Sequence, residues 1–384
     1  MKVLMICRIF PPRYGGGVIQ AIFLAKELKR QGIDVEFATN NYRQKTALDI
    51  YDGFSVYKFC SYFESKALSS LGQFIYFLKM FLFLLFKSNH DIILFFGISG
   101  FDTFLFPLTK LFGKKTLLQL TLVGCDDPLS IRKRKLGFLF HPSLYCVDKI
   151  IPISTKLFHL SLESGISKKK LELIPVGVNT SMFFKLPTED KKVLKSKLGF
   201  LNYSHIFLAV GQIEERKGYE FMIQAWKFIG EKLPNSVLLI AGPKNDVSNP
   251  YFQKLLTIIK ESSLKNILFL GFIHNINEYM KITDCLLHCS TAEGLPNTLI
   301  EAGISSVPIV CRHIDGVTSD IIITSNIGRQ CFSDLPADFA KEVFSILKER
   351  NELNTALNIE ELKKRFDIKE VARQYINLFN WLKT

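Results

Sequence analysis

The sequence lacks any apolar run long enough to cross a bilayer, which takes about 20 residues. The longest candidate, residues 74–86 (FIYFLKMFLFLLF), has only thirteen and is interrupted by Lys79. At the amino terminus a run of five apolar residues precedes Arg8, too few for a secretory signal, so this stretch is expected to form a first strand. These absences favour a cytoplasmic protein.

Paired cysteine motifs are also missing. The eight cysteines are scattered, and the nearest pair, Cys285 and Cys289, has no matching second pair. This spacing argues against a zinc site or a disulfide framework and favours reduced, buried thiols. Low-complexity segments are absent as well, and a hydrophobic content of 48% with 22% charged residues is typical of a folded protein with a large interior.

Charge is abundant but one-sided. The formal net charge is +13; residues 1–170 hold 24 basic and 12 acidic side chains, whereas residues 171–384 hold 25 and 24. A basic surface on one half suits anionic lipid headgroups or nucleic acid, and a merely lysine-rich surface is the alternative. We expect peripheral contact with an anionic membrane and no nucleic acid.

Strand-like and helical segments alternate along both halves, which predicts an α/β protein with parallel sheets wrapped by helices. A length of 384 residues suggests two domains, and a change in composition over residues 173–201 places the boundary after residue 172. The expected strands are residues 3–7, 33–39, 54–59, 91–96, 116–122, 149–153, 206–210, 237–241, 267–270, 285–288 and 308–311.

Residues 68–87 are the most apolar helix candidate, because aromatic side chains surround nearly the whole helix. Such a helix is either buried or in contact with lipid. Burial is favoured, since an interior strand at residues 91–96 follows at once. Two basic clusters, residues 132–135 and 168–170, are usually solvated faces, but they keep a membrane surface open as the alternative.

Glycine-rich turns follow two of the predicted strands. Residues 15–17 are three glycines just before a helix, as a phosphate-binding loop requires, although a plain flexible loop fits equally well. Residues 211–218 read GQIEERKG and also open a helix. Their Arg216 and Lys217 could stabilise a diphosphate there; the alternative is two solvent-exposed basic residues.

Two carboxylates, Glu293 and Glu301, stand eight positions apart within residues 290–316. Glu293 lies in a Gly/Pro turn at the carboxyl end of a predicted strand, where ligands of open α/β sheets bind, and it could accept hydrogen bonds from sugar hydroxyls. Glu301 lies three residues after Thr298 and could instead complete a capping box.

Taken together, these motifs resemble the family-4 retaining glycosyltransferases of the GT-B fold over nearly the whole chain. The motifs that carry the resemblance are the glycines at 15–17, IPVGVN at 174–179, GQIEERKG at 211–218, GFI at 271–273 and, above all, EGLPN at 293–297 followed by Glu301-Ala302. The resemblance implies two Rossmann-like domains facing across a cleft: an acceptor-binding domain, 1–172, and a nucleotide-sugar-binding domain, 173–365. It also implies that a final helix, 366–384, packs back on the first domain.

The resemblance assigns roles as well. Lys217 would neutralise the leaving diphosphate with help from Arg216, Glu293 would hold the donor sugar, and Glu301 would bind the ribose. The chain departs from the family at Gln212, where arginine is usual, at Val123, where histidine is usual, and at Ser306, where glycine is usual. The donor-binding residues would be Gly16, Gly17, Gly211, Gln212, Phe272, Ile273, Gly294, Leu295, Pro296, Asn297 and Glu301.

Beside the missing histidine stand Asp126 and Asp127. We take Asp126 as a contact for the acceptor hydroxyl, so the predicted catalytic set is Glu293, Lys217, Arg216 and Asp126. A helix N-cap next to Pro128 is the alternative for this aspartate pair.

The expected activity is transfer of a sugar, with retention, from a nucleotide-diphosphate sugar to a hydroxyl acceptor, without a metal or other cofactor. The expected acceptor is a lipid-linked glycan intermediate of a surface polysaccharide, at the inner face of the plasma membrane. Two alternatives stay open: a catalytically weak nucleotide-sugar-binding subunit, motivated by Gln212 and Val123, and a nucleotide-sugar 2-epimerase of the same fold, which needs no acceptor.

Overall fold

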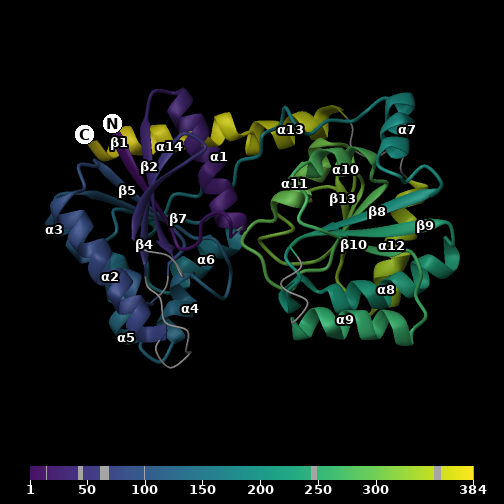
Figure 1. Ribbon diagram of the computed structural model, residues 1–384, viewed down its shortest axis with the longest axis horizontal. Helices are drawn as coiled ribbons and strands as arrows, with labels where there is room; N and C mark the ends of the chain where they lie inside the picture. Colours follow the sequence, from purple (N-terminus) through teal and green to yellow (C-terminus); the bar gives the residue numbers. More distant parts are fainter. Residues whose placement is uncertain are drawn as a thin grey trace. The chain divides into compact units, whose positions relative to one another are not determined.

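The computed structural model describes residues 1–383 except 14, 42–45, 61–68, 99, 244–248 and 350–355. The chain divides into two compact units, Met1–Gly177 with Ile368–Thr384, and Val178–Asp367. The sequence boundaries after residues 172 and 365 lie slightly earlier than these crossings. Each unit contains a sheet of mostly parallel strands with helices around it, so the predicted α/β class is confirmed (Figure 1).

The sheet of the first unit has seven strands in the order β3-β4-β2-β1-β5-β6-β7. All neighbours are parallel except β3 and β4, which are antiparallel. The strand order reverses between β1 and β5. The strands are β1 (Lys2–Cys7), β2 (Asp34–Asn41), β3 (Ala47–Tyr51), β4 (Phe54–Cys60), β5 (Ile92–Phe96), β6 (Lys115–Gln119) and β7 (Lys149–Ile151).

Helices cover both faces of this sheet, because successive side chains of a strand point to opposite sides. On β5, Leu94 and Phe96 join the core formed with α1 and α14, whereas the ring of Phe95 packs on Phe106 of α3 with centroids 5.0 Å apart. The helices are α1 (Gly16–Arg30), α2 (Ser69–Phe86), η2 (Gly100–Phe104), α3 (Leu105–Leu111), α4 (Pro128–Lys133), α5 (Gly137–Phe140), η3 (Pro142–Cys146), α6 (Thr155–Glu163), η4 (Lys168–Lys170) and α14 (Ile368–Lys383).

Strand β3 was not among the predicted strands. It forms a hairpin with β4 through Asp52 and Gly53, whose φ angles are 53° and 78°. An Asp-Gly pair with two positive φ angles is the usual signature of a tight hairpin turn, so the sequence carried a signal for this strand.

Helix α2 is only half buried, and its predicted burial is wrong for one of its faces. Residue 68, where the predicted helix began, lies outside the described residues. Tyr76, Met80, Phe83 and Leu84 are buried against the rest of the unit. The opposite face is exposed and equally apolar: Leu71, Phe74, Leu78, Leu82, Leu85 and Phe86. In the described part of the chain, no helix has the length and hydropathy needed to span a membrane.

The sheet of the second unit has six parallel strands in the order β10-β9-β8-β11-β12-β13. The strands are β8 (His205–Val210), β9 (Ser236–Ala241), β10 (Ile267–Gly271), β11 (Cys285–His288), β12 (Ile309–Arg312) and β13 (Gly328–Cys331). Strand β13 is a second strand that the sequence did not predict. The helices are α7 (Thr188–Lys197), η5 (Glu215–Lys217), α8 (Tyr219–Lys232), α9 (Pro250–Glu261), α10 (Ile276–Ile282), α11 (Asn297–Ile304), α12 (Pro336–Lys348) and α13 (Ala356–Phe366).

Candidate active site

Two loops of the second unit meet where its strand order reverses. From β8 the chain continues to β9 on one side, and from β11 it continues to β12 on the other. The loops that follow β8 and β11 therefore leave the sheet at adjacent carboxyl ends, which is where open α/β sheets bind ligands. A backbone hydrogen bond joins them, because Thr291 N donates to Arg216 O at 2.8 Å.

Glycine at position 218 makes this close approach possible. Gly218 has a φ of 66°, and a Cβ there would clash with the carbonyl oxygen of Cys289. At the start of the same loop, the carbonyl oxygen of Gly211 accepts a hydrogen bond of 2.8 Å from the hydroxyl of Tyr219. Burial raises the pKa of Tyr219, so this hydroxyl stays a donor. The β8 loop is thus fixed at both ends.

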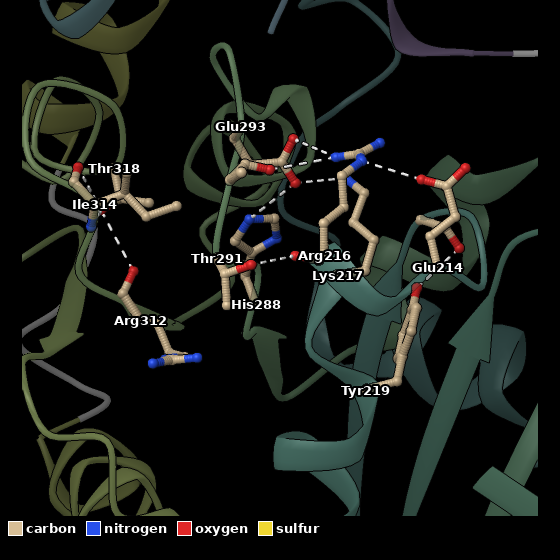
Figure 2. A network of polar contacts seen from close by, with 12 residues as sticks. Glu214, Arg216, Lys217, Tyr219, His288, Thr291, Glu293, Arg312, Ile314 and Thr318 are labelled. Carbon is tan, nitrogen blue, oxygen red and sulfur yellow. Dashed lines mark hydrogen bonds and ion pairs between the residues drawn. The ribbon is translucent and has the colours of Figure 1, made fainter. Parts of the chain in front are cut away.

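Figure 2 shows what this loop presents: the side chains of Lys217 and Arg216 converge on the carboxylate of Glu293. Lys217 Nζ lies 2.5 Å from Glu293 Oε1, and Arg216 donates to Glu293 Oε2 at 3.3 Å. Arg216 also donates to Glu214 at 3.0 Å and to the carbonyl of Ala292 at 3.3 Å. The structure therefore brings together three of the four predicted catalytic residues.

The carboxylate of Glu293 is buried yet stays ionised. Burial by itself would raise its pKa, but the charges of Lys217, His288 and Arg216 and the hydrogen bond from Lys217 outweigh it, so the pKa lies below its ordinary value. His288 has its own pKa lowered to about 4, chiefly by burial, and is neutral at pH 7. The two cations that balance Glu293 at neutral pH are therefore Lys217 and Arg216.

His288 is a member of the site that sequence reasoning missed. It is the last residue of β11, and its Nε2 lies 3.6 Å from Glu293 Oε1, too far for a hydrogen bond. Among the described residues, three buried atoms near the Glu293 turn have no hydrogen-bond partner: His288 Nε2, Ser290 Oγ and Asn297 Oδ1. Such atoms are uncommon in folded proteins, and a role in ligand binding or catalysis is one explanation for them. A polar residue ending a buried strand was the available signal.

Glu301 lies in the second turn of α11, and the capping-box interpretation of this residue is wrong. The helix begins at Asn297 with Pro296 as its N-cap, so Thr298 is inside the helix and cannot cap it. Burial raises the pKa of Glu301 to about 7, and none of the described residues forms an ion pair with it. Gly294, Leu295 and Pro296 form the buried turn between Glu293 and this helix.

The other predicted donor residues of this unit lie on the same edge of the sheet. Gln212 follows β8, and Phe272 and Ile273 follow β10, with β9 between the two strands. Phe272 is exposed, and its ring meets that of His274 edge-on at 4.8 Å. A partly exposed aromatic side chain at this edge suits contact with a nucleotide base, and its role there stays a prediction.

In the first unit, the glycine loop lies beside the loop that follows β6. Gly15 is the N-cap of α1, no side chain caps the helix, and α1 begins at Gly16. A Cβ at Gly17 would lie 3.5 Å from Cγ2 of Thr121. The first-turn amides of a 15-residue helix thus stand at the carboxyl edge of the sheet, as anion binding requires.

The carboxylate of Asp126 holds the loop that follows β6 in place. It accepts hydrogen bonds from Thr121 N at 2.8 Å, Thr121 Oγ1 at 2.7 Å and Leu122 N at 2.8 Å. Asp127 accepts from Ser130 N at 2.8 Å and is the N-cap of α4, as the alternative interpretation had it. The geometry favours a structural role for Asp126, and its predicted contact with an acceptor hydroxyl stays a prediction.

We expect Asp126→Ala to destabilise the protein by about 2–4 kcal/mol, because three half-buried donors lose their buried acceptor. Burial raises the pKa of Asp126 to about 6, so wild-type stability falls as the pH rises from about 4 through 6, and the variant loses this slope. Denaturant unfolding between pH 4 and 7 measures both effects. Asp127→Ala removes the cap of α4 and the acceptor of Gly124 N, so it should cost about 2 kcal/mol and keep the pH slope. Unchanged stability with impaired acceptor use would instead support the acceptor contact.

Comparison with known proteins places this site in a family. Residues 190–365 match the family described as glycosyl transferases group 1. The second unit of this chain is similar to the group 1 glycosyltransferases, and the solved structures below show the GT-B fold. The matched segment contains the β8 and β11 loops, so the resemblance read from the EGLPN motif is confirmed.

Relatives and solved structures agree with this assignment. A glycosyltransferase of Methanocaldococcus jannaschii is 29% identical over 210 residues, 53% of this chain and 50% of that protein. The alpha-monoglucosyldiacylglycerol synthase of Acholeplasma laidlawii is 33% identical over 147 residues, 37% of this chain and 36% of that enzyme. The chain thus spans half or less of these relatives' lengths. The structure of Anabaena HepE with UDP and glucose is similar over 99% of both chains, with a TM-score of 0.79 and 17% identity, which supports the fold alone.

Proposed function

We propose that this protein is a group 1 glycosyltransferase, which moves a sugar from a nucleotide-diphosphate sugar to a hydroxyl acceptor. The observation that carries the proposal is the pairing of Lys217 and Arg216 with a buried carboxylate, Glu293, at the reversal point of the sheet. A diphosphate needs fixed positive charge, and a sugar needs hydrogen-bond acceptors. Both are provided here by the loops that follow β8 and β11.

The chemistry follows from where charge develops. The bond between the anomeric carbon and the diphosphate oxygen breaks, and the cations of Lys217 and Arg216 stabilise the negative charge on that leaving group. The acceptor oxygen bonds to the anomeric carbon from the same face, and a diphosphate oxygen takes the acceptor's proton. This retaining route needs no protein nucleophile, so Glu293 would orient the sugar. The described residues contain no cluster of three metal-binding side chains, and independence of metal stays part of the proposal.

For the acceptor we propose a lipid-linked glycan intermediate of surface polysaccharide synthesis, used at the inner face of the plasma membrane. The names of two relatives support this choice: an alpha-monoglucosyldiacylglycerol synthase of Acholeplasma laidlawii and a UDP-Gal:alpha-D-GlcNAc-diphosphoundecaprenol galactosyltransferase of Escherichia coli. The first name specifies a glucosylated diacylglycerol as the product, and the second specifies an acceptor sugar attached to a lipid diphosphate. The basic excess of the first unit suits such a location.

The test begins with a thermal-shift screen of the purified chain against UDP-, GDP-, ADP- and TDP-sugars. A ligand at 100 times its dissociation constant adds about 2.7 kcal/mol of stability. The sugar nucleotide that binds is then incubated with lipid-linked glycan acceptors, and the product is detected by mass spectrometry. Binding of none of the sugar nucleotides would refute the proposal. Binding without transfer, in a chain whose Glu293→Ala variant still supports glycan synthesis in cells, would favour the binding-subunit alternative. An epimer formed without any acceptor would indicate the 2-epimerase.

The raised pKa of Glu301 makes donor binding dependent on pH. Only the ionised carboxylate can accept hydrogen bonds from both ribose hydroxyls. Because burial raises the pKa of Glu301 to about 7, affinity for a nucleoside diphosphate should increase about tenfold from pH 6 to pH 8. Calorimetric titration at each pH measures this affinity. The matched control ligand is the 2′,3′-dideoxy nucleotide, whose phosphates titrate in the same way but whose sugar has no hydroxyl for Glu301 to bind. Glu301→Gln should bind both ligands with equal pH dependence. If the two ligands still differed in pH dependence as much in Glu301→Gln as in the wild type, Glu301 would not be the ribose ligand.

A further inference from the structure

Helix α2 carries a continuous apolar stripe that faces solvent. Its exposed side chains recur at intervals of three or four residues over four helical turns, the spacing that places them on one helix face. The side chains on the opposite face are buried, so the helix is apolar both inward and outward. The stripe comprises Leu71, Phe74, Leu78, Leu82 and Leu85, and Phe86, 75% exposed, lies at its end.

Two further exposed apolar side chains lie in helices that aromatic contacts connect to α2. Phe77 of α2 contacts Phe104, which in turn contacts Phe140 of α5, with ring centroids 6.5 Å and 5.6 Å apart. Two residues before Phe140, Phe138 is 72% exposed. Phe81 of α2 contacts Phe112, and the residue before it, Leu111, is 78% exposed. Figure 1 shows α2, α3 and α5 grouped on one side of the first unit.

Exposed lysines stand next in sequence to exposed apolar side chains in this part of the first unit. Three exposed pairs follow one another directly in the sequence, each with one large apolar and one lysine side chain: Phe86-Lys87, Lys110-Leu111 and Lys135-Leu136. A lysine beside an inserted apolar side chain can extend its ammonium to a lipid phosphate while its neighbour enters the acyl region.

The charge of the whole unit agrees with this pattern. Residues 1–177 and 368–384 contain 27 Lys and Arg and 14 Asp and Glu, whereas residues 178–367 contain 22 of each. The entire net charge of +13 therefore belongs to the unit that carries α2. Each basic side chain near an anionic bilayer contributes attraction that falls off within about 10 Å.

We propose that the exposed stripe of α2, with Phe86, Leu111 and Phe138, inserts into the interfacial layer of an anionic lipid bilayer. The occupant is a bilayer and not a second copy of the chain, because two units of charge +13 facing each other through this surface would repel. This inference names the surface that makes the membrane contact proposed above, and it rests on the proposed function for its role. It stands on exposure, spacing and charge, none of which involves the donor site.

Vesicle sedimentation of the full chain tests the surface without any nucleotide. Vesicles of phosphatidylcholine alone are compared with vesicles that also contain phosphatidylglycerol. We expect Leu78→Glu with Leu82→Glu to weaken binding to the mixed vesicles by about tenfold or more. Lys87→Gln with Lys110→Gln should weaken binding to the mixed vesicles several-fold and leave binding to the neutral ones unchanged. The matched control is Leu256→Glu with Leu335→Glu, two exposed leucines of the second unit, which should bind like wild type.

Two further measurements keep the outcomes separate. In Leu82→Trp, the added tryptophan fluorescence should shift to the blue on mixing with phosphatidylglycerol vesicles, which reports insertion of that position. Light scattering gives the oligomeric state: a dimer that Leu78→Glu with Leu82→Glu converts to monomer would assign the stripe to a second copy and overturn the proposal. The proposal would also be overturned if the folded variant Leu78→Glu with Leu82→Glu sedimented with the vesicles as the wild type does. Nucleotide binding is assayed on the same samples, so loss of the donor function would be recognised independently.

Discussion

Replacing Lys217 by methionine is expected to lower kcat/KM for sugar transfer by about 10²–10³-fold. Lys217 Nζ is closer to the carboxylate of Glu293 than the guanidinium of Arg216 is, and it lies in the loop at the reversal point of the sheet. A fixed charge aimed at a developing anion acts mainly in the transition state, and removal of one such group typically costs this much. The initial rate of transfer at several donor concentrations measures it, and kcat should fall more than KM rises.

Lys217→Met also leaves the buried carboxylate of Glu293 with one fewer positive charge beside it. Part of the loss of activity could therefore come from a disturbed fold. The pKa of Glu293 is held below its ordinary value mainly by the charge of Lys217, against the opposing effect of burial. Lys217→Met should therefore destabilise the second unit, and adding Glu293→Gln should restore most of that stability because the unpaired charge disappears. Activity should not return in the double variant. A recovery of activity along with stability would mean that Lys217 only balances Glu293.

The elements of this fold could be predicted because buried parallel strands are short apolar runs and the helices between them have their own period. Strands β3 and β13 were not predicted from the sequence, and the reasons differ. β3 is an exposed edge strand, with Leu48 and Ile50 facing solvent, and its residues carry no burial pattern. β13 reads Gly328-Arg329-Gln330-Cys331, and its place in the sheet depends on pairing with β12. Pairing partners distant in sequence leave no local signal.

The candidate site was predicted in composition but not in its internal contacts. Sequence spacing placed Lys217 and Glu293 at strand ends, and parallel topology then required those ends to lie on one edge. The sequence could not show that Lys217 and Arg216 both bind the carboxylate of Glu293, because these contacts depend on side-chain rotamers. The exposed stripe of α2 escaped for a similar reason: an apolar helix does not reveal which of its faces is covered.

If Lys217 and Arg216 hold the donor diphosphate, as proposed, the ion pairs of Glu293 mask that site before the donor binds. A diphosphate must compete with the carboxylate for Lys217 and Arg216, and since the pKa of Glu293 is lowered, the competition persists at neutral pH. The Glu293→Gln variant should therefore bind a nucleoside diphosphate about tenfold more tightly, equivalent to about 1.4 kcal/mol. Transfer should nevertheless fall by about 100-fold or more, because the neutral amide holds the sugar hydroxyls less well.

Calorimetric titration with the nucleoside diphosphate, and with the nucleoside that lacks phosphate, separates the two effects. Only the diphosphate should gain affinity in Glu293→Gln, since only it uses the released cations. Glu214→Gln is the matched control: it removes the more exposed carboxylate that pairs with Arg216 alone, so it should change diphosphate affinity little and leave transfer near the wild-type rate. Weaker diphosphate binding in Glu293→Gln would mean that the carboxylate positions the two cations for the ligand. In that case the ion pairs preorganise the site, and masking is wrong.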